Sequence, residues 1–181
     1  MKTIVLISIQ QRGINILSDT SDNRGIPGHL ILNPIHFLST GFGAGLSPVA
    51  PGTVGTLVAV PLYYFISDLS WQIYLLIVLV GFFTGIYLCQ QTADALGVHD
   101  HGGIVWDEII GYWITMSLVP DASWLWMLAG FITFRFFDIL KPWPIKQADA
   151  RLKGGFGIMF DDVLAAVYAM AVLQVFVLMT R

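Results

Sequence analysis

The sequence predicts an all-α protein that is embedded in a membrane. Of its 181 residues, 56% are hydrophobic and only 12% are charged, which is about half the charged share of an ordinary soluble domain. The apolar residues gather in five stretches, separated by Pro, Gly, Ser and Asp residues that end helices or form turns. We therefore expect an integral membrane bundle of about five apolar helices, some of them too short to span a bilayer.

A polar tail precedes the apolar stretches. Lys2 and the apolar residues 3–9 resemble a signal peptide, but the run is at the short limit and no small residues suited to cleavage follow it. Residues 14–28 are rich in Asp, Ser, Asn, Gly and Pro. We expect residues 1–32 to form the tail and residues 33–181 to form one membrane-embedded domain, with a short interfacial helix over residues 35–42.

The five apolar stretches differ in length. We expect helices over residues 54–66, 71–88 with a more polar continuation to 96, 108–119, 123–140 and 161–179. Ser123 is a suitable N-cap for the fourth helix, and Pro142 and Pro144 prevent its continuation. A membrane span needs about 20 residues at 1.5 Å each. Only the second, fourth and fifth stretches meet that length, so the other two must be tilted or shielded by their neighbours.

The order of the helices predicts that most acidic residues lie on one side. If every stretch crosses, the turns at residues 67–70 and 120–122 share a far side. Two of the twelve acidic residues lie in the tail and two lie in these turns, which leaves eight on the near side. These are Asp94, Asp100, Asp107, Glu108, Asp138, Asp149, Asp161 and Asp162. Solvation alone explains such clustering poorly.

Basic residues predict which way the bundle faces. Neither far-side turn contains Lys or Arg. Five basic residues fall on the near side, namely Arg135, Lys141, Lys146, Arg151 and Lys153. By the positive-inside rule the near side is cytoplasmic. The net charge is −3 and no basic stripe alternates with aromatics, so nucleic acid is not an expected partner. The single cysteine, Cys89, lies in an apolar run and excludes a disulfide framework.

Several carboxylates adjoin apolar helix ends, where they are costly unless compensated. Helix capping explains Asp107 and Asp161, which open predicted helices. It does not explain Asp138, because the helix dipole disfavours an anion near a C-terminus. Asp138 therefore requires either a salt bridge to Arg135 three residues earlier or a metal ion.

The ligand types favour a hard cation. Carboxylates from different helices, without an accompanying cysteine or H-x-x-x-H pattern, suit Mg²⁺ better than Zn²⁺. The cluster alone does not separate a phosphatase from a membrane cation-binding or transport protein. A transporter would place carboxylates near the middle of the bilayer, however, and these helices have apolar middles.

Two further features are candidates for phosphate binding. Residues 41–56 are rich in Gly and lead into a helix, so their N–H groups either bind phosphate or allow close helix packing. Lys141 follows a helix end, where it either holds phosphate or extends to the membrane interface. His99 and His101 precede Asp107 by a few residues. Each is either a proton donor to a leaving group or a loop histidine without a catalytic role.

The motifs resemble those of the phosphatidylglycerophosphatase A family. They cover about residues 33–170 in the family's order and show no departure from its pattern. The matching segments are Asn33-Pro34, Gly41-Phe42-Gly43 to Ser47-Pro48, Ala50-Pro51-Gly52-Thr53, Gly97-Val98-His99-Asp100-His101-Gly102, Ile104-Val105-Trp106-Asp107-Glu108, Phe134-Arg135 with Asp138, Lys141-Pro142-Trp143-Pro144-Ile145, and Gly154-Gly155 to Asp161-Asp162.

The resemblance implies a Mg²⁺-dependent phosphatase in the bacterial inner membrane, with its active face toward the cytoplasm. It would hydrolyse phosphatidylglycerol phosphate from the bilayer to phosphatidylglycerol and inorganic phosphate, a step of glycerophospholipid biosynthesis. Our hypothesis for the site assigns the metal to Glu108, Asp138 and Asp162, supported by Asp107 or Asp161. It assigns phosphate binding to Lys141, Arg135 and Thr53, and protonation of the leaving group to His99. Attack by water and a covalent aspartyl-phosphate both remain open.

Overall fold

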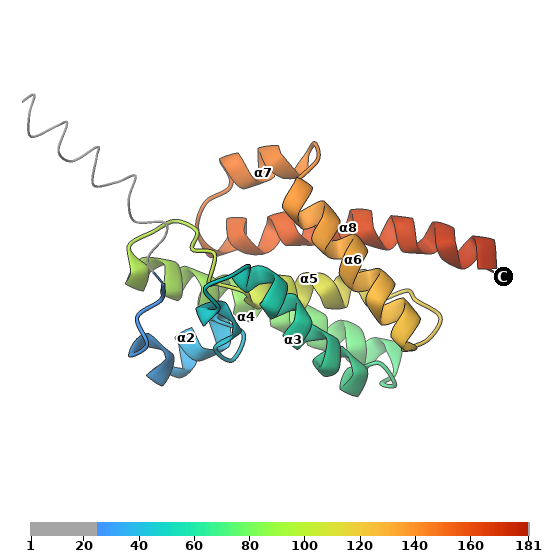
Figure 1. Cartoon of the computed structure of the whole chain (residues 1–181), viewed down its shortest axis with the longest axis horizontal. Helices are drawn as coiled ribbons and strands as arrows, with labels where there is room; N and C mark the ends of the chain where they lie inside the picture. Colours follow the sequence, from blue (N-terminus) through green and yellow to red (C-terminus); the bar gives the residue numbers. More distant parts are fainter. Residues whose placement is uncertain (1–24, 181) are drawn as a thin grey trace, which may run out of the picture.

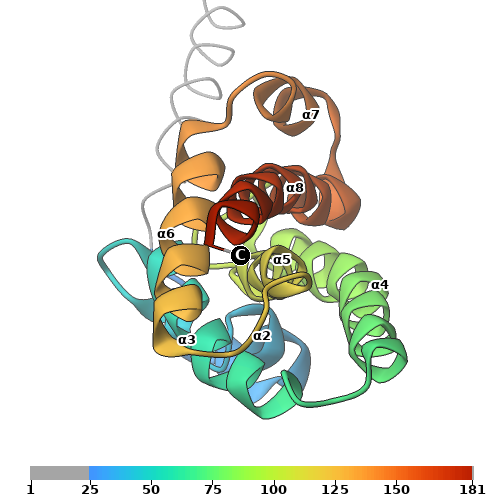
Figure 2. The ribbon, with the colours of Figure 1, turned by 90° about the vertical axis from the view of Figure 1, so that its right-hand side faces the viewer.

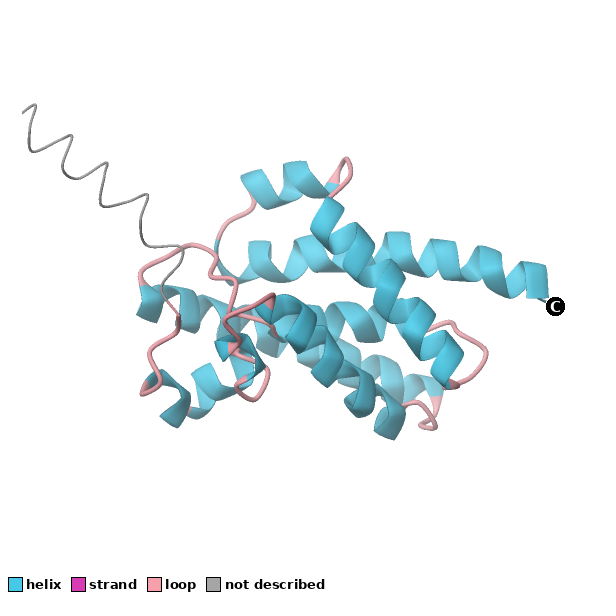
Figure 3. Cartoon of the chain, viewed as in Figure 1, coloured by secondary structure: helices cyan, strands magenta, loops and turns pink. Residues whose placement is uncertain are grey.

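A computed structural model describes residues 25–180, and every regular element in that range is a helix (Figures 1 and 3). The elements are the 3₁₀ helix η1 (Leu30–Leu32), α2 (Pro34–Ser39), the 3₁₀ helix η2 (Ala44–Leu46), α3 (Pro51–Ile66), α4 (Trp71–Leu96), α5 (Trp106–Met116), α6 (Trp124–Leu140), α7 (Ile145–Arg151) and α8 (Gly154–Thr180). The prediction of an all-α bundle is confirmed.

The predicted N-terminal tail is only partly visible, because residues 1–24 lie outside the described residues. Its last part packs against the bundle. Ile26 is buried, and its side chain lies so close to Gly103 that an added Cβ there would meet it at 2.6 Å. The Asn33 side chain then caps α2 by accepting a hydrogen bond from the Ile35 N–H at 3.0 Å. Packing on the bundle therefore begins before residue 33.

Helix α8 lies at the centre of the bundle. The end-on view shows it surrounded by α4, α5, α6 and α7 (Figure 2), and each of these helices packs against it. Its inner surface includes Ala165, Ala166 and Ala169, which are completely buried. Small side chains let neighbouring helices approach closely. As a result, residues of α8 can reach side chains from several neighbouring helices.

The helix directions bring the predicted near-side segments to one end. Helices α3, α5 and α8 begin on the side of the bundle where α4 finishes, in the left half of Figure 1, and α6 finishes at the top of the view beside α7. The connections at residues 67–70 and 117–123 lie at the other end, together with the C-terminus of α8. This is the arrangement predicted from the order of the stretches. We call the end that carries the starts of α3, α5 and α8 the site end.

Two helices among residues 25–180 are long and apolar enough to cross a membrane, α4 with 26 residues and α8 with 27. They measure about 39 and 40 Å, against about 30 Å of hydrocarbon. Helix α6, which the sequence predicts to be a third full span, has only 17 residues and measures about 26 Å. That expectation is therefore wrong for α6. The molecule is a membrane helical bundle in which shorter helices pack against two long ones.

Several helices begin earlier than predicted, and one was missed. Helix α3 begins at Pro51, α5 at Trp106 and α8 at Gly154, seven residues before the predicted start. Asp161 therefore lies in the third turn of α8. The capping explanation for Asp161 is wrong, because the helix dipole acts mainly on the first turn. Helix α7 follows Pro144 directly and has no counterpart among the predicted helices.

Candidate functional site

Three carboxylates from α5 and α8 converge at the site end. Asp107 and Glu108 lie in the first turn of α5, and Asp162 lies in α8. One oxygen of each lies within 4.8 Å of the others, and each residue is no more than 9% exposed. Gly111, one turn after Asp107, lets α6 lie directly on α5 here, because a Cβ added at Gly111 would lie 2.6 Å from Phe134 Cζ. We call Asp107, Glu108 and Asp162 the carboxylate cluster.

Each residue of the carboxylate cluster has one buried oxygen without a hydrogen-bond partner in the described part of the chain. Asp107 Oδ1, Glu108 Oε2 and Asp162 Oδ2 are buried, and none has a hydrogen-bond partner among residues 25–180. Burial raises the pKa of Glu108 from its ordinary 4.5 to about 7, against the opposing effects of Asp107 and Arg135. Burial and the neighbouring Glu108 and Asp162 also raise the pKa of Asp107 well above its usual range. Buried anions of this kind are costly unless a cation offsets them, so the oxygens fit a metal site.

Arg135 and Asp138 lie beside the carboxylate cluster. Arg135 Nη1 lies 2.5 Å from Asp138 Oδ2 and 3.6 Å from Glu108 Oε1. Asp138 is close enough to act electrostatically on both Glu108 and Asp162. The salt bridge weighed for Asp138 is therefore present. The grouped oxygens come from Asp107, Glu108 and Asp162, whereas the sequence assigned Asp138 in place of Asp107; a metal contact of Asp138 stays a prediction.

The first turn of α3 lies directly against the carboxylate cluster. A Cβ added at Gly52 would lie 2.2 Å from Glu108 Oε1 and 3.1 Å from Arg135 Nη2, so only glycine fits there without displacement. The N–H groups of Gly52 and Thr53 have no carbonyl one turn earlier to bond. They give this helix end a partial positive charge next to the carboxylates. The role of Gly52 was missed, although its place between Pro51 and Thr53 is visible in the sequence.

The rest of the Gly-rich segment serves close packing. A Cβ at Gly45 would lie 1.9 Å from the Gly103 carbonyl oxygen, and one at Gly55 would lie 2.5 Å from Val105 Cβ. Gly41 and Gly43 adopt positive φ angles of 57° and 91°. Close packing is therefore shown at Gly45 and Gly55. The helix end at Gly52 lies at the site, and phosphate binding there stays a prediction.

Lys141 joins three elements at the edge of the site. It follows the last residue of α6 and has a φ of 43°. Its Nζ pairs with Asp161 of α8 and lies 3.1 Å from Asp149 Oδ1 of α7. Burial by itself lowers the pKa of Lys141, but Asp161 and Asp149 outweigh it and hold the pKa above its usual value. Lys141 is thus a charged clamp, and it already neutralises Asp161.

His99 and His101 both accept hydrogen bonds from backbone N–H groups. His99 Nε2 accepts the N–H of Gly154 at 3.3 Å, at the start of α8. His101 is buried, and its Nδ1 accepts the N–H of Gly103 at 3.0 Å. Neither belongs to the grouped ligand atoms. The structure therefore shows His99 at the start of α8, and its role as a proton donor stays a prediction.

The fold and the site together define the class of protein. The molecule is a membrane helical bundle with a buried acidic site beside an arginine and a helix N-terminus, which are groups suited to a cation and a phosphate. The family model described as "Phosphatidylglycerophosphatase A" matches residues 37–177. The chain belongs to this family.

Curated relatives agree with the family match. A "Phosphatidylglycerophosphatase A" of Escherichia coli (strain K12) is 52% identical over 141 residues, covering 78% of this chain and 82% of that protein. A protein of the same name from Haemophilus influenzae is 50% identical over 153 residues, covering 84% and 94%. A "Putative phosphatidylinositol-3-phosphatase" of Bacteroides thetaiotaomicron is 40% identical over 146 residues, covering 76% and 90%. No solved structure matches the chain.

Proposed function

We propose that this protein removes the terminal phosphate of phosphatidylglycerol phosphate and leaves phosphatidylglycerol in the bilayer. The observation that carries the proposal is the buried carboxylate cluster with unpaired oxygens, lying directly against the first turn of α3 and Arg135. The names of two relatives at least 50% identical to this chain give the same activity. A phosphate monoester requires positive charge around its oxygens, which Arg135 and the first turn of α3 would supply together with a cation held by the carboxylate cluster.

Mg²⁺ is the cation that best fits the donor set. Asp107, Glu108, Asp138 and Asp162 carry four negative charges against one on Arg135, so the net charge is −4 + 1 = −3 when all are ionised. Asp107, Glu108 and Asp162 would hold a divalent ion, which would reduce the net charge from −3 to −1. When bound, Mg²⁺ would neutralise the phosphate and polarise an attacking water.

The phosphate itself would lie between Arg135 and α3. Arg135 Nε is buried and makes no hydrogen bond within the described part of the chain, so it is available to a phosphate oxygen. The N–H groups of Gly52 and Thr53 offer further donors at the helix end. Lys141 supports the same region from the end of α6, where it holds Asp161 in place.

In the reaction we propose, water forms a new bond to phosphorus while the bond between phosphorus and the glycerol oxygen breaks. Asp107, whose Oδ1 has no hydrogen-bond partner among the described residues, accepts the proton of the water. The leaving glycerol oxygen takes up a proton from His99 or from solvent, so that the products are an alcohol and inorganic phosphate. The alternative, attack by an aspartate, predicts a phosphorylated protein that can be trapped by acid quenching.

We further propose that the site end faces the cytoplasm in the bacterial inner membrane. The basic residues Lys146, Arg151 and Lys153 lie in or beside α7 at that end, whereas the turn at residues 67–70 contains none. Because Cys89 is buried, the cysteines introduced in Lys146→Cys and Ser67→Cys would be the reactive ones, and they would be labelled from opposite sides of sealed inner-membrane vesicles. Labelling of both from the same side would contradict this orientation.

The position of the carboxylate cluster favours catalysis over cation transport. Asp107 and Glu108 lie in the first turn of α5, at the site end, and Asp162 is the ninth residue of the 27-residue α8, about 12 Å from its start. The family match points the same way. One relative bears the name of a phosphoinositide phosphatase, so phosphatidylinositol 3-phosphate belongs in the substrate panel.

The test is phosphate release from phosphatidylglycerol phosphate in detergent micelles, with Mg²⁺ or with EDTA. We expect turnover by the wild type with Mg²⁺, loss of turnover in Asp162→Asn, and wild-type turnover in the matched control Asp68→Asn at the far end. An inactive but folded wild type would refute the proposed function. A fully active Asp162→Asn would keep the function and refute the proposed site.

A further inference from the structure

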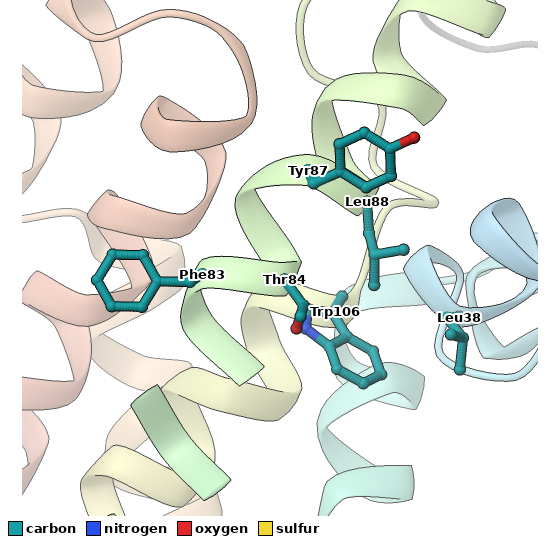
Figure 4. A pocket seen from close by; sticks show the side chains of 6 residues that line it. All are labelled: Leu38, Phe83, Thr84, Tyr87, Leu88 and Trp106. Carbon is teal, nitrogen blue, oxygen red and sulfur yellow. The ribbon is translucent and has the colours of Figure 1, made fainter. Parts of the chain in front are cut away.

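An apolar groove opens on the side of α4. It has a volume of about 520 Å³, within the usual range for small-molecule sites. Its walls come from α2, α4 and the start of α5, as Figure 4 shows. They are formed by Leu38, Phe83, Thr84, Tyr87, Leu88 and Trp106. We call it the Trp106 groove.

The walls of the Trp106 groove offer hydrocarbon rather than hydrogen bonds. The Trp106 Nε1–H donates to the Gly81 carbonyl at 3.0 Å, and the Thr84 hydroxyl donates to the Val80 carbonyl at 2.7 Å. Figure 4 shows the Tyr87 hydroxyl directed away from Trp106. A polar occupant would therefore lose hydrogen bonds to water without replacement. A hydrocarbon occupant would lose none.

The groove is fixed in shape and lies next to the site in the chain. A Cβ added at Gly85 would lie 2.7 Å from Trp106 Cδ1, so the indole ring lies directly on the backbone of α4. Trp106 immediately precedes Asp107 of the carboxylate cluster. Phe83 and Tyr87 are exposed on α4, one of the two membrane-spanning helices. The groove therefore borders the bilayer at Phe83 and Tyr87. At Trp106 it is one residue in the chain from the carboxylate cluster.

We propose that the Trp106 groove holds the first part of an acyl chain of the lipid substrate while its phosphate lies at the carboxylate cluster. The occupant must be apolar, must enter from the bilayer and must carry its polar end toward Asp107. A phosphorylated glycerolipid meets all three conditions. This inference rests on the proposed function and adds the acyl part of substrate recognition to it.

The test fills the groove and compares substrates. Thr84→Phe adds a ring at an exposed position of α4 that lines the groove, and Thr84→Ile adds less. Leu76→Phe is the matched control, since Leu76 is 59% exposed on the same helix and lies outside the groove. The substrates are dioleoyl phosphatidylglycerol phosphate and its dibutyryl analogue, whose chains are too short to fill the groove. Thermal midpoints show that each variant is folded.

We expect Thr84→Phe to raise the KM for the dioleoyl substrate about tenfold, the effect of losing contact with about two methylene groups. Thr84→Ile should give a smaller increase. The kcat, the KM for the dibutyryl substrate and both constants of Leu76→Phe should stay at wild-type values. Unchanged constants in Thr84→Phe would mean that bulk lipid occupies the groove and would overturn the proposal, as would equal losses on both substrates.

A binding readout separates this proposal from the proposed function. Phosphatidylglycerol with a photoreactive acyl chain should label the peptide that contains residues 83–88 in the wild type, and much less in Thr84→Phe. If the wild type hydrolyses neither substrate, the proposed function fails, and this labelling alone decides whether the groove holds an acyl chain. Equal labelling of the wild type and Thr84→Phe would overturn the proposal that the Trp106 groove holds an acyl chain.

Discussion

Replacing Gly52 by alanine tests the contact between α3 and the carboxylate cluster. The added Cβ would lie 2.2 Å from Glu108 Oε1, whereas unstrained contacts of this kind are longer than 3.0 Å. The carboxylate must therefore move by about 1 Å. A misplacement of about 1 Å in a catalytic site can cost about a hundredfold in rate. Because the displaced atom is at the end of a side chain, the fold can absorb the change.

We therefore expect Gly52→Ala to lower kcat for phosphatidylglycerol phosphate about a hundredfold while its thermal midpoint stays near that of the wild type. Alanine also suits a helix better than glycine, which works against any loss of stability. Phosphate release in micelles gives the rate, and circular dichroism gives the midpoint.

The matched control is Gly102→Ala. Gly102 lies in the neighbouring loop, and a Cβ there would lie 4.0 Å from Pro51 Cγ, an ordinary contact. We expect wild-type activity from this variant. Wild-type activity in Gly52→Ala as well would refute the inference that the first turn of α3 lies against a catalytic carboxylate.

Three further predictions concern metal binding and stability. Mg²⁺ at about a hundred times its Kd should stabilise the folded protein by about 2.7 kcal/mol, and Asp162→Asn should remove most of this shift; an equal shift in both proteins would exclude Asp162 as a ligand. Lys141→Met should destabilise by about 3 kcal/mol because Asp161 loses its partner, and adding Asp161→Asn should restore most of the loss; no restoration would refute the clamp. Gln90→Ala should destabilise by about 1 kcal/mol, since Gln90 Oε1 accepts the Gly155 N–H at 2.8 Å, and an unchanged thermal midpoint would contradict this.

The structure also explains three glycines around the site. Gly52, Gly85 and Gly111 lie where a Cβ would meet Glu108, Trp106 and Phe134 respectively. Each lets another helix or side chain lie directly on a helix backbone, as is common where membrane helices pack. The glycines therefore set the distances between the elements that form the site.

The sequence by itself determined the class of the fold and indicated the carboxylates of the candidate site. Long apolar runs and few charges require helices in a membrane, because only such segments satisfy their backbone groups locally in hydrocarbon. The turns between the runs placed eight carboxylates at one end, and the family motifs included Asp107, Glu108 and Asp162. These properties depend on local sequence, so they could be predicted without coordinates.

The limits of the helices and the grouping of the carboxylates were decided by the tertiary structure. The start of α8 contains three glycines, which weaken a helix locally, yet Gly155 allows that start to pack against the Ile86 carbonyl of α4. The sequence assigned the metal to Glu108, Asp138 and Asp162, whereas the three grouped oxygens belong to Asp107, Glu108 and Asp162 and Asp138 pairs with Arg135; a metal contact of Asp138 stays a prediction. The Trp106 groove likewise requires three segments distant in the chain. Distances between such segments depend on how whole helices pack, and no local pattern encodes them.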